Sequence, residues 1–591
     1  MLNKPFRSPT TAGFMENIRL SRLQALFRRG EIGLVIAGVV VGIVSGLLVA
    51  LISGMSTGLH YLIFGVTDTL SGSGVSGRIV LLAPVMGGVI LGLVFFILSK
   101  RRKKPMIDPI EANALHGGRL SLTDSVIVCA QNVISNGFGA SVGLEAGYTQ
   151  IASGVASKLG VKLKLRRGDL RILVGCGAAG AISAAFGAPL TGAFYAIELI
   201  IGTYTVVTLA PVVVSALVAT LVAQQISDHT LAIDVGSFGH VQTADYLPAI
   251  ILGVLCAGVG IALMQTVAFI EETARKSSIT LPFRPALGGL VVGTLALISP
   301  QVLSSGHGAL HIDLNSDATI PVLLALFLMK SVASAVSIGS GFRGGLFFAS
   351  LFIGALVGKI FAHAAPYFDG TTLTPAVYAV VGMSSFAAAV IGGPLTMTFL
   401  ALELTGDFPI TALVLASVIA TSIVVRTSFG YSFATWRFHL RGETIRSAHD
   451  VGWIRDLTVG RMMRADVRTA NVGISLSEFR SHYPLGSTQR VIMVNDSGRY
   501  EGIVLLPDVY ADHGEGDRGM ESFLRYRNDV LLPTMNAKQA AAMFDKTGSE
   551  ALAVVNDLVE NRPIGLLSES HTLRRYSEEL DQRRREVSGE L

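Results

Sequence analysis

One fourteen-residue segment occurs twice in this chain, and this repeat constrains the fold more than any other feature. Residues 186–199 read FGAPLTGAFYAIEL and residues 391–404 read IGGPLTMTFLALEL, identical at 8 of 14 positions at a constant offset of 205. Both copies lie in apolar regions that Gly and Pro interrupt too often for full membrane spans to fit between the breaks. Related halves with interruptions at matching places point to a transport site near the bilayer midplane. The repeat therefore predicts a transporter or channel built from two halves.

The composition agrees with a polytopic membrane protein followed by a soluble part. Half of the 591 residues are hydrophobic and 15% are charged, against about 25% charged in soluble proteins. This balance excludes disordered chains, coiled coils and most soluble enzymes. The net charge of +5 gathers in short clusters beside apolar runs, as the positive-inside rule predicts, so nucleic-acid binding is not expected.

Three parts follow from the distribution of charge. Residues 1–30 are polar and basic, residues 31–442 form the expected transmembrane domain, and residues 443–591 read as a soluble domain. The basic cluster Lys100 to Lys104 ends the second span, which orients that end and the N-terminus toward the cytoplasm, together with the C-terminal domain. Unbroken apolar runs are expected as spans at residues 32–64, 79–99, 206–223, 247–269, 285–297 and 322–336.

The broken regions offer helix starts rather than fixed charges as an ion site. Their acids are few: Glu145, Glu198 and Glu403. Gly143 and the pair Gly344-Gly345 each precede an expected helix. Helix N-termini carry unpaired amides and the positive end of the helix dipole, so they attract anions. Two such termini, one from each half, predict an anion site, with Arg343 either adding positive potential near an entrance or lying as a solvated loop charge.

Glu145 is the acid that matters most in this prediction. A carboxylate at a helix start is also a common cap, but ionisable residues inside a membrane are expensive and usually functional. Its carboxylate can occupy the place of an anion, and protonation would release it. Glu198 and Glu403 recur in both halves, which favours a structural role over a transport role, such as bonding buried backbone amides.

These residues resemble the CLC family of chloride channels and proton/chloride antiporters, from about Arg28 to Leu440. Gly143-Leu-Glu-Ala-Gly147 is similar to the family's G-R/K-E-G-P, and Gly344-Gly-Leu-Phe-Phe348 to its G-G-x-F-x-P. The resemblance implies an all-α domain of two inverted repeats, a homodimer in a bacterial inner membrane, chloride as the transported ion, and Glu145 as gate and proton acceptor. It implies anion contacts at Gly143, Ala146, Gly147, Gly345, Leu346, Phe347 and Phe348.

The departures from the family pattern concern the inner end of the pathway. The coordinating serine falls on Lys104, Pro105 or Met106, of which Pro105 is preferred because nitrate-preferring members carry proline there. The internal proton-relay glutamate is Leu199, and the central tyrosine falls on Ala434, with Tyr431 as a possible substitute. Leu199 cannot carry protons, so a channel-like or weakly proton-coupled pathway is the first hypothesis and a proton/anion antiporter the alternative.

The soluble part contains two similar units 61 residues apart. Met493 to Asp496 followed by Gly502 to Leu505 matches Val554 to Asp557 followed by Gly565 to Ser568, each pair after an expected helix. The pattern resembles tandem CBS domains, at about 458–512 and 523–580, which makes this a smaller α/β domain. Such pairs commonly bind adenine nucleotides, here through Asp508 and Ser568, but each unit keeps only part of the pattern, so a structural role is favoured.

Two other classes of protein fit less well. A CBS-containing divalent-cation transporter would carry clustered acids along its spans, and an intramembrane enzyme would carry a catalytic motif, but neither pattern occurs in the sequence. The 12 histidines and 3 cysteines show no metal-ligand spacing. We therefore expect no catalytic residues, no metal and no cofactor other than a nucleotide on the CBS-like units.

Overall fold

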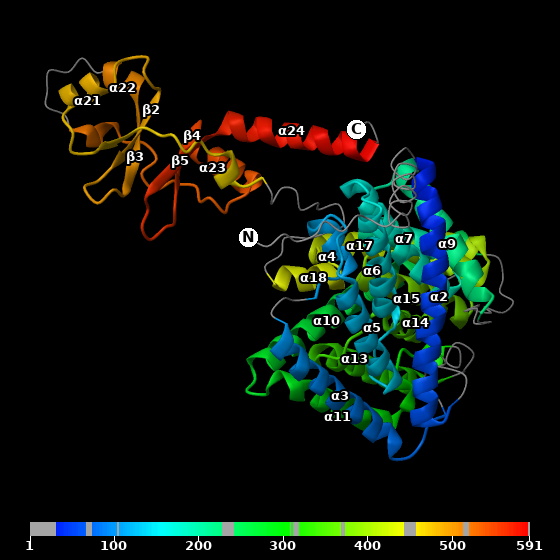
Figure 1. Cartoon of the computed structure of the whole chain (residues 1–591). Helices are drawn as coiled ribbons and strands as arrows, with labels where there is room; N and C mark the ends of the chain where they lie inside the picture. Colours follow the sequence, from blue (N-terminus) through cyan, green and yellow to red (C-terminus); the bar gives the residue numbers. More distant parts are fainter. Residues whose placement is uncertain are drawn as a thin grey trace, which may run out of the picture. The chain divides into compact units, whose positions relative to one another are not determined.

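The structure, a computed structural model, describes residues 31–66, 72, 74–102, 106–226, 241–307, 309–310, 318–367, 373–441, 457–511 and 519–588, with side chains to 579. Contacts divide the chain into two compact units, Met1–Asp450 and Val451–Leu591 (Figure 1). The first is mostly helical and the second contains the sheets. The fold class predicted from the sequence is thereby confirmed. The N-terminal segment 1–30, the boundary at 442–443 and Pro105 lie outside the described residues.

Eight helical segments among the described residues are long and apolar enough to cross a membrane. Their apolar runs agree with the six expected spans, and most extend a few residues further at one or both ends. Side chains on their outer faces are apolar, for example Leu47, Leu82 and Leu328, each about half exposed, as lipid contact requires. The eight segments are Glu31–Phe64, Ile79–Arg101, Arg167–Phe186, Val206–Gln224, Thr243–Lys276, Leu281–Ile298, Ile320–Ser340 and Phe408–Leu440.

The first half of the membrane unit breaks into short helices where the sequence predicts them. Its elements are α2 (Glu31–Phe64), α3 (Ile79–Arg101), α4 (Pro109–Leu115), α5 (Leu122–Gly137), α6 (Glu145–Lys162), α7 (Arg167–Phe186), α8 (Pro189–Tyr195), the π-helix η1 (Ala196–Ile201) and α9 (Val206–Gln224).

The second half repeats the order from α5 onward in α13 to α17. Its elements are η2 (Thr243–Asp245), α10 (Tyr246–Lys276), η3 (Leu281–Phe283), α11 (Arg284–Ile298), η4 (Pro300–Val302), α13 (Ile320–Ser340), α14 (Phe347–Ala362), η5 (Ala365–Tyr367), α15 (Pro375–Ile391), α16 (Pro394–Thr405), α17 (Phe408–Ser428) and α18 (Phe433–Leu440).

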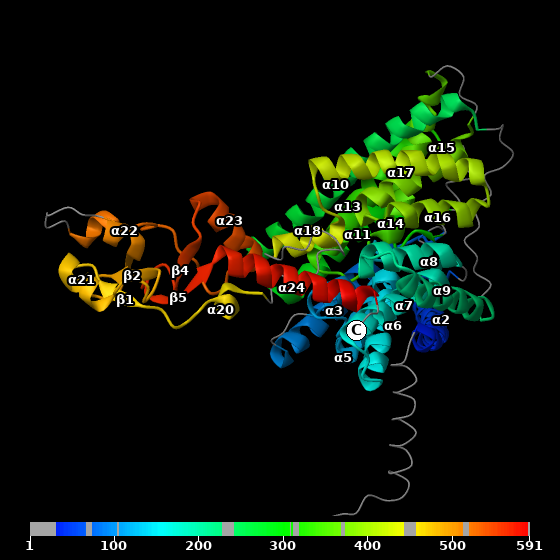
Figure 2. The same cartoon turned by 90° about the horizontal axis from the view of Figure 1, so that it is seen from above.

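The internal repeat is visible in the backbone. Helices α7 and α15 both end on a left-handed glycine, Gly187 at φ 66° and Gly392 at φ 86°. The next residues, Ala188 and Gly393, share an unusual conformation, with φ,ψ of −124°, 87° and −126°, 83°. A proline then opens α8 and α16, which pack against each other (Figure 2). The Gly-x-Pro run thus makes the same turn in both halves.

The C-terminal unit consists of two related strand pairs with their helices. In one sheet β1 is parallel to β2, and β2 is antiparallel to β3. In the other, β4 is antiparallel to β5. Both antiparallel pairs contain an irregularity at the matching place, between Met493 and Val494 and between Val554 and Val555. This repeated bulge agrees with the tandem arrangement predicted from the sequence.

The helices of this unit also agree with the expected positions. The strands are β1 (Thr469–Asn471), β2 (Arg490–Val494), β3 (Tyr500–Leu505), β4 (Ala551–Val555) and β5 (Pro563–Ser568), and the helices are α20 (Val459–Met462), α21 (Leu476–His482), α22 (Leu506–Ala511), η6 (Met520–Phe523), α23 (Ala537–Thr547) and α24 (Glu569–Ser588). A buried cluster that includes Ile492 and Ile503 from one pair and Ala553 and Val555 from the other joins the two halves.

Candidate anion pathway

The two Gly-led loops predicted to bind an anion meet in the structure. The backbone N–H of Gly143 donates to the carbonyl of Gly345 at 2.9 Å, and the N–H of Gly345 donates to the carbonyl of Gly143 at 3.1 Å. The side-chain amide of Asn132 donates to the carbonyls of Gly143 and Arg343, at 3.0 and 2.9 Å. The starts of α6 and α14 are therefore fixed against each other by backbone bonds between the halves.

Glu145 opens α6 and turns its carboxylate onto the start of α14. Its Oε1 accepts a hydrogen bond from the backbone N–H of Phe348 at 3.1 Å, and the residue is only 4% exposed. Its Oε2 has no hydrogen-bond partner among the described residues. A side chain at position 143 would place its Cβ 1.9 Å from that oxygen, so only glycine fits there. The carboxylate thus occupies the helix N-terminus where an anion would bind.

The other predicted anion contacts surround this carboxylate or shape its surroundings. A Cβ at Gly345 would lie 3.5 Å from Glu145 Oε2 and 3.5 Å from the Cβ of Ala146. Gly147 instead leaves room for the side chain of Asn132. A Cβ added at position 147 would lie 2.4 Å from Asn132 Oδ1. Leu346 is the buried residue immediately before α14.

Aromatic rings line the start of α14. Phe347 lies 4.9 Å from Phe186 and 6.0 Å from Tyr195, measured between ring centroids. His307 stacks on Phe348 at 3.5 Å. The motifs recognised in the sequence include neither Tyr195 nor His307. The repeat does distinguish Tyr195, because the second copy has the apolar Leu400 at the corresponding position.

Glu198 and Glu403 form a reciprocal pair of helix caps. Glu198 accepts from the backbone N–H groups of Leu395 and Thr396, at 3.0 and 2.9 Å, and from the Thr396 hydroxyl at 2.7 Å. Glu403 accepts in the same way from Leu190, Thr191 and the Thr191 hydroxyl, at 2.7, 2.9 and 2.7 Å. Each carboxylate therefore satisfies the first turn of the helix in the other half, as the structural interpretation predicts.

Leu199, the position of the missing relay glutamate, lies within the π-helix η1. Asn113 of α4 donates to the carbonyls of Ile200 and Arg171, both at 3.1 Å, and Arg171 donates to Ile201 at 3.2 Å. The wide turn is thus held by side chains of α4 and α7. A π-helical turn inside an α-helical segment often marks a functional site.

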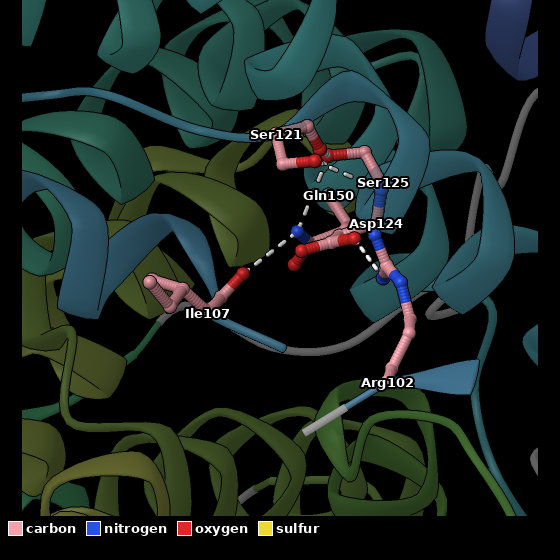
Figure 3. A network of polar contacts seen from close by, with 6 residues as sticks. All are labelled: Arg102, Ile107, Ser121, Asp124, Ser125 and Gln150. Carbon is pink, nitrogen blue, oxygen red and sulfur yellow. Dashed lines mark hydrogen bonds and ion pairs between the residues drawn. The ribbon is translucent and has the colours of Figure 1, made fainter. Parts of the chain in front are cut away.

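The segment before α4 stands where the family's serine-containing loop is expected. Gln150 of α6 donates from Nε2 to the carbonyl of Ile107 at 3.0 Å and to the Ser125 hydroxyl at 3.3 Å. Figure 3 shows this contact within a network that also contains Ser121 and an ion pair between Arg102 and Asp124. Asp108 follows as the N-cap of α4 and accepts from the N–H of Glu111 at 2.8 Å.

Tyr431 lies in the turn between α17 and α18. Its hydroxyl is 3.2 Å from Nδ1 of His439, and its ring packs with Phe429 and Trp436. Ala434, the position that the family pattern gives to tyrosine, packs in a small cluster with Ile110 of α4. Arg343 places its guanidinium 5.9 Å from the ring centroid of Phe95.

The two proposed nucleotide contacts of the C-terminal unit have protein partners. Asp508 at the start of α22 forms an ion pair with Arg525 at 2.7 Å. The Ser568 hydroxyl accepts from the N–H of His571 at 3.4 Å. An adenine nucleotide that used Asp508 would have to displace Arg525.

A comparison with protein families identifies the membrane unit. The model described as "Voltage gated chloride channel" matches residues 86–426, more than half of the chain. The chain belongs to this family. The matched residues include both loops of the pathway and both copies of the repeat. The curated relatives agree with this assignment at the sequence level, and solved structures agree at the level of the fold.

Among curated relatives, a ClcB-like chloride channel protein of Ralstonia nicotianae is 31% identical over 338 residues, 56% of this chain and 78% of the relative. The voltage-gated ClC-type chloride channel ClcB of Escherichia coli O139:H28 is 29% identical over 352 residues, 59% of this chain and 84% of the relative. The family's channels and transporters are not enzymes, which agrees with the absence of a catalytic motif in the sequence.

Solved structures share the fold. A slow cyanobacterial Cl⁻/H⁺ antiporter superposes with a TM-score of 0.60 at 22% identity, over 69% of this chain and 97% of the other. A CLC-type fluoride/proton antiporter gives 0.57 at 17% identity, over 71% and 98%. A eukaryotic CLC transporter gives 0.58 at 18% identity and covers 91% of this chain and 97% of the other.

Proposed function

We propose that this chain carries chloride across a membrane along a pathway gated by Glu145, as a channel-like or weakly proton-coupled member of its family. The observation that carries this proposal is the hydrogen bond from the Phe348 N–H to the Glu145 carboxylate. A carboxylate bound at a helix start is a tethered anion, and a free anion competes for the same N–H once the side chain leaves.

The energetics suit a gate. A hydrogen bond to a charged group contributes about 1.5–3 kcal/mol, and Oε2 of Glu145 has no partner among the described residues to add to it. Protonation removes the charge and weakens the bond. Each loss of about 1.4 kcal/mol changes the ratio of bound to released side chain tenfold, so protonation favours release and chloride can compete for the N–H that the side chain leaves.

Chloride efflux from liposomes containing the full chain tests this gate. We expect Glu145→Gln to raise chloride flux severalfold and to flatten its dependence on pH, because an amide neither carries the charge nor titrates. Glu272→Gln is the matched control, since Glu272 forms an ion pair with Lys276 on the exposed side of α10. Equal flux and equal pH dependence in wild type and Glu145→Gln would refute the gate.

Proton/anion antiport is the second candidate, with chloride or another anion as the substrate. It is favoured by the solved structures that share the fold, two of which are a Cl⁻/H⁺ and a fluoride/proton antiporter. It predicts that an imposed chloride gradient drives proton uptake at a fixed ratio and that Glu145→Gln abolishes this uptake. Chloride flux without proton movement would exclude antiport and favour the channel-like pathway.

We propose further that the chain works as a homodimer in a bacterial inner membrane, with both termini and the CBS-like unit in the cytoplasm. The basic residues after α3 support this orientation, and bacterial relatives support the location. For the CBS-like unit we propose a structural role, with adenine-nucleotide binding at Asp508 and Ser568 as the alternative. The ion pair of Asp508 with Arg525 supports the structural role.

A further inference from the structure

The membrane unit contains a second carboxylate, Asp108, whose surroundings fit proton transfer. Asp108 caps α4 and remains partly exposed although it lies within the membrane unit. Among the described residues Asp108 forms no ion pair. The two nearby arginines pair with other acids instead: Arg441 with Glu111 at 3.8 Å and Arg437 with Glu271 at 3.3 Å. Asp108 can therefore take up a proton without first breaking a salt bridge.

Helix α6 connects the gate residue Glu145 to the segment that precedes Asp108. Glu145 starts this helix, and one turn later the Thr149 hydroxyl donates to the Glu145 carbonyl at 2.9 Å. The next residue, Gln150, donates to the carbonyl of Ile107 at 3.0 Å and so fixes the backbone immediately before Asp108 (Figure 3). Gln150 is 3% exposed, and the segment it holds is consequently anchored to the gate helix.

Tyr195 packs beside α4, in a cluster that also includes Ile110, two residues after Asp108. Its hydroxyl interacts with that of Thr149, and it is within electrostatic range of both Asp108 and Glu145. Its ring lies 6.0 Å from Phe347 at the start of α14, and part of its surface stays accessible. A phenol hydroxyl accepts and donates a proton at the same oxygen, which Leu199 and the surrounding apolar side chains cannot do.

We propose that Asp108, Tyr195 and Glu145 form a proton route along α6, with Asp108 as the acceptor at the α4 end. This inference rests on the proposed chloride transport and names the residues of its weak proton coupling. A proton from solution binds the Asp108 carboxylate. That proton passes to the Tyr195 oxygen while the phenol proton passes toward Glu145. Asp108 is then charged again, Glu145 is neutral, and one positive charge has moved.

The charged groups around Asp108 fit this cycle. Arg437 of α18 and Arg441, which follows that helix, act on it electrostatically and favour the anion between transfers. Glu111 on the helix that Asp108 caps and Glu271 of α10 offset them. Tyr195 is within electrostatic range of both acids, so the route links the charge of Asp108 to that of the gate.

The test uses the full chain in liposomes under a chloride gradient, with chloride and pH electrodes read together. We expect Asp108→Asn and Tyr195→Phe each to lower the protons moved per chloride by at least about tenfold, since proton transfer by a positioned group contributes factors of this size or more. Asp108→Glu should restore much of the ratio.

Asp407→Asn is the matched control. Asp407 caps α17 and accepts from the N–H of Ile410 at 2.8 Å, the same bond length that Asp108 makes at α4. It should leave the ratio unchanged, which separates proton transfer from capping.

The outcomes separate this inference from the proposed function. Wild type that moves no chloride would refute the transport proposal itself. Wild type that moves chloride without protons would overturn the proton route alone, and so would a wild-type ratio in both variants. Should Asp108→Asn yield no folded protein, Tyr195→Phe decides, since a wild-type ratio there excludes the phenol as carrier.

Discussion

The reciprocal caps at Glu198 and Glu403 offer a direct test of how the two halves are held together. Replacing Glu403 by alanine removes the acceptor for two backbone N–H groups and one hydroxyl at the start of α8. Replacing Glu198 does the same at the start of α16. Glu198 also accepts from the Tyr204 hydroxyl, so its replacement should cost at least as much as that of Glu403.

The size of the effect follows from the bonds removed. Hydrogen bonds to a charged group contribute about 1.5–3 kcal/mol each, but both carboxylates are partly exposed and water replaces part of what is lost. We expect a loss of roughly 2–4 kcal/mol for either variant. With an unfolding entropy of about 2.1 cal/mol/K per residue, a membrane unit of about 410 residues would lose about 2–5 °C in melting temperature.

Thermal unfolding of the purified full chain in detergent, followed by intrinsic fluorescence, measures this loss. Glu272→Ala serves as the control, because its ion pair with Lys276 lies at the surface and surface pairs contribute little. Glu403→Gln should lie between wild type and Glu403→Ala, since the amide oxygen still accepts but carries no charge. A melting temperature of Glu403→Ala equal to that of wild type would refute the capping argument, as would a Glu198→Ala variant that unfolds well above Glu403→Ala.

Three further predictions follow from single contacts. Gly143→Ala places a Cβ 1.9 Å from Glu145 Oε2, so its chloride flux in liposomes should rise toward that of Glu145→Gln; unchanged flux would show that the carboxylate has another resting place. Lys330 is fully buried and donates to the carbonyls of Val302 and Ser304 at 3.1 and 2.9 Å, so Lys330→Met should cost roughly 1–3 kcal/mol in thermal unfolding, whereas an unchanged melting temperature would mean that those carbonyls find other donors. Titration calorimetry of the full chain with ATP, ADP and AMP should give no binding heat, because Asp508 is engaged by Arg525; binding that Asp508→Ala abolishes would contradict this expectation.

The sequence alone identified the repeat, the broken helices and the acid that is proposed as the gate. Apolar runs reveal spans because burial in lipid demands them, and the Gly-x-Pro turns at 187–189 and 392–394 recur because both halves need a left-handed residue before a helix start. An isolated acid in an acid-poor region is visible without coordinates. The same local signals predicted both strand pairs of the C-terminal unit.

Only the tertiary structure decided what each acid touches. That Glu145 binds the amide of Phe348, and that Glu198 and Glu403 cap each other's halves, depends on residues about 200 positions apart. Asp108 gave no motif and Tyr195 only a difference between the two copies of the repeat, because the proposed proton route depends on proximity in space rather than on spacing along the chain. Local propensity and hydrophobic pattern place helices in the membrane, whereas packing between the two halves brings the starts of α6 and α14 together, which neither half can do by itself.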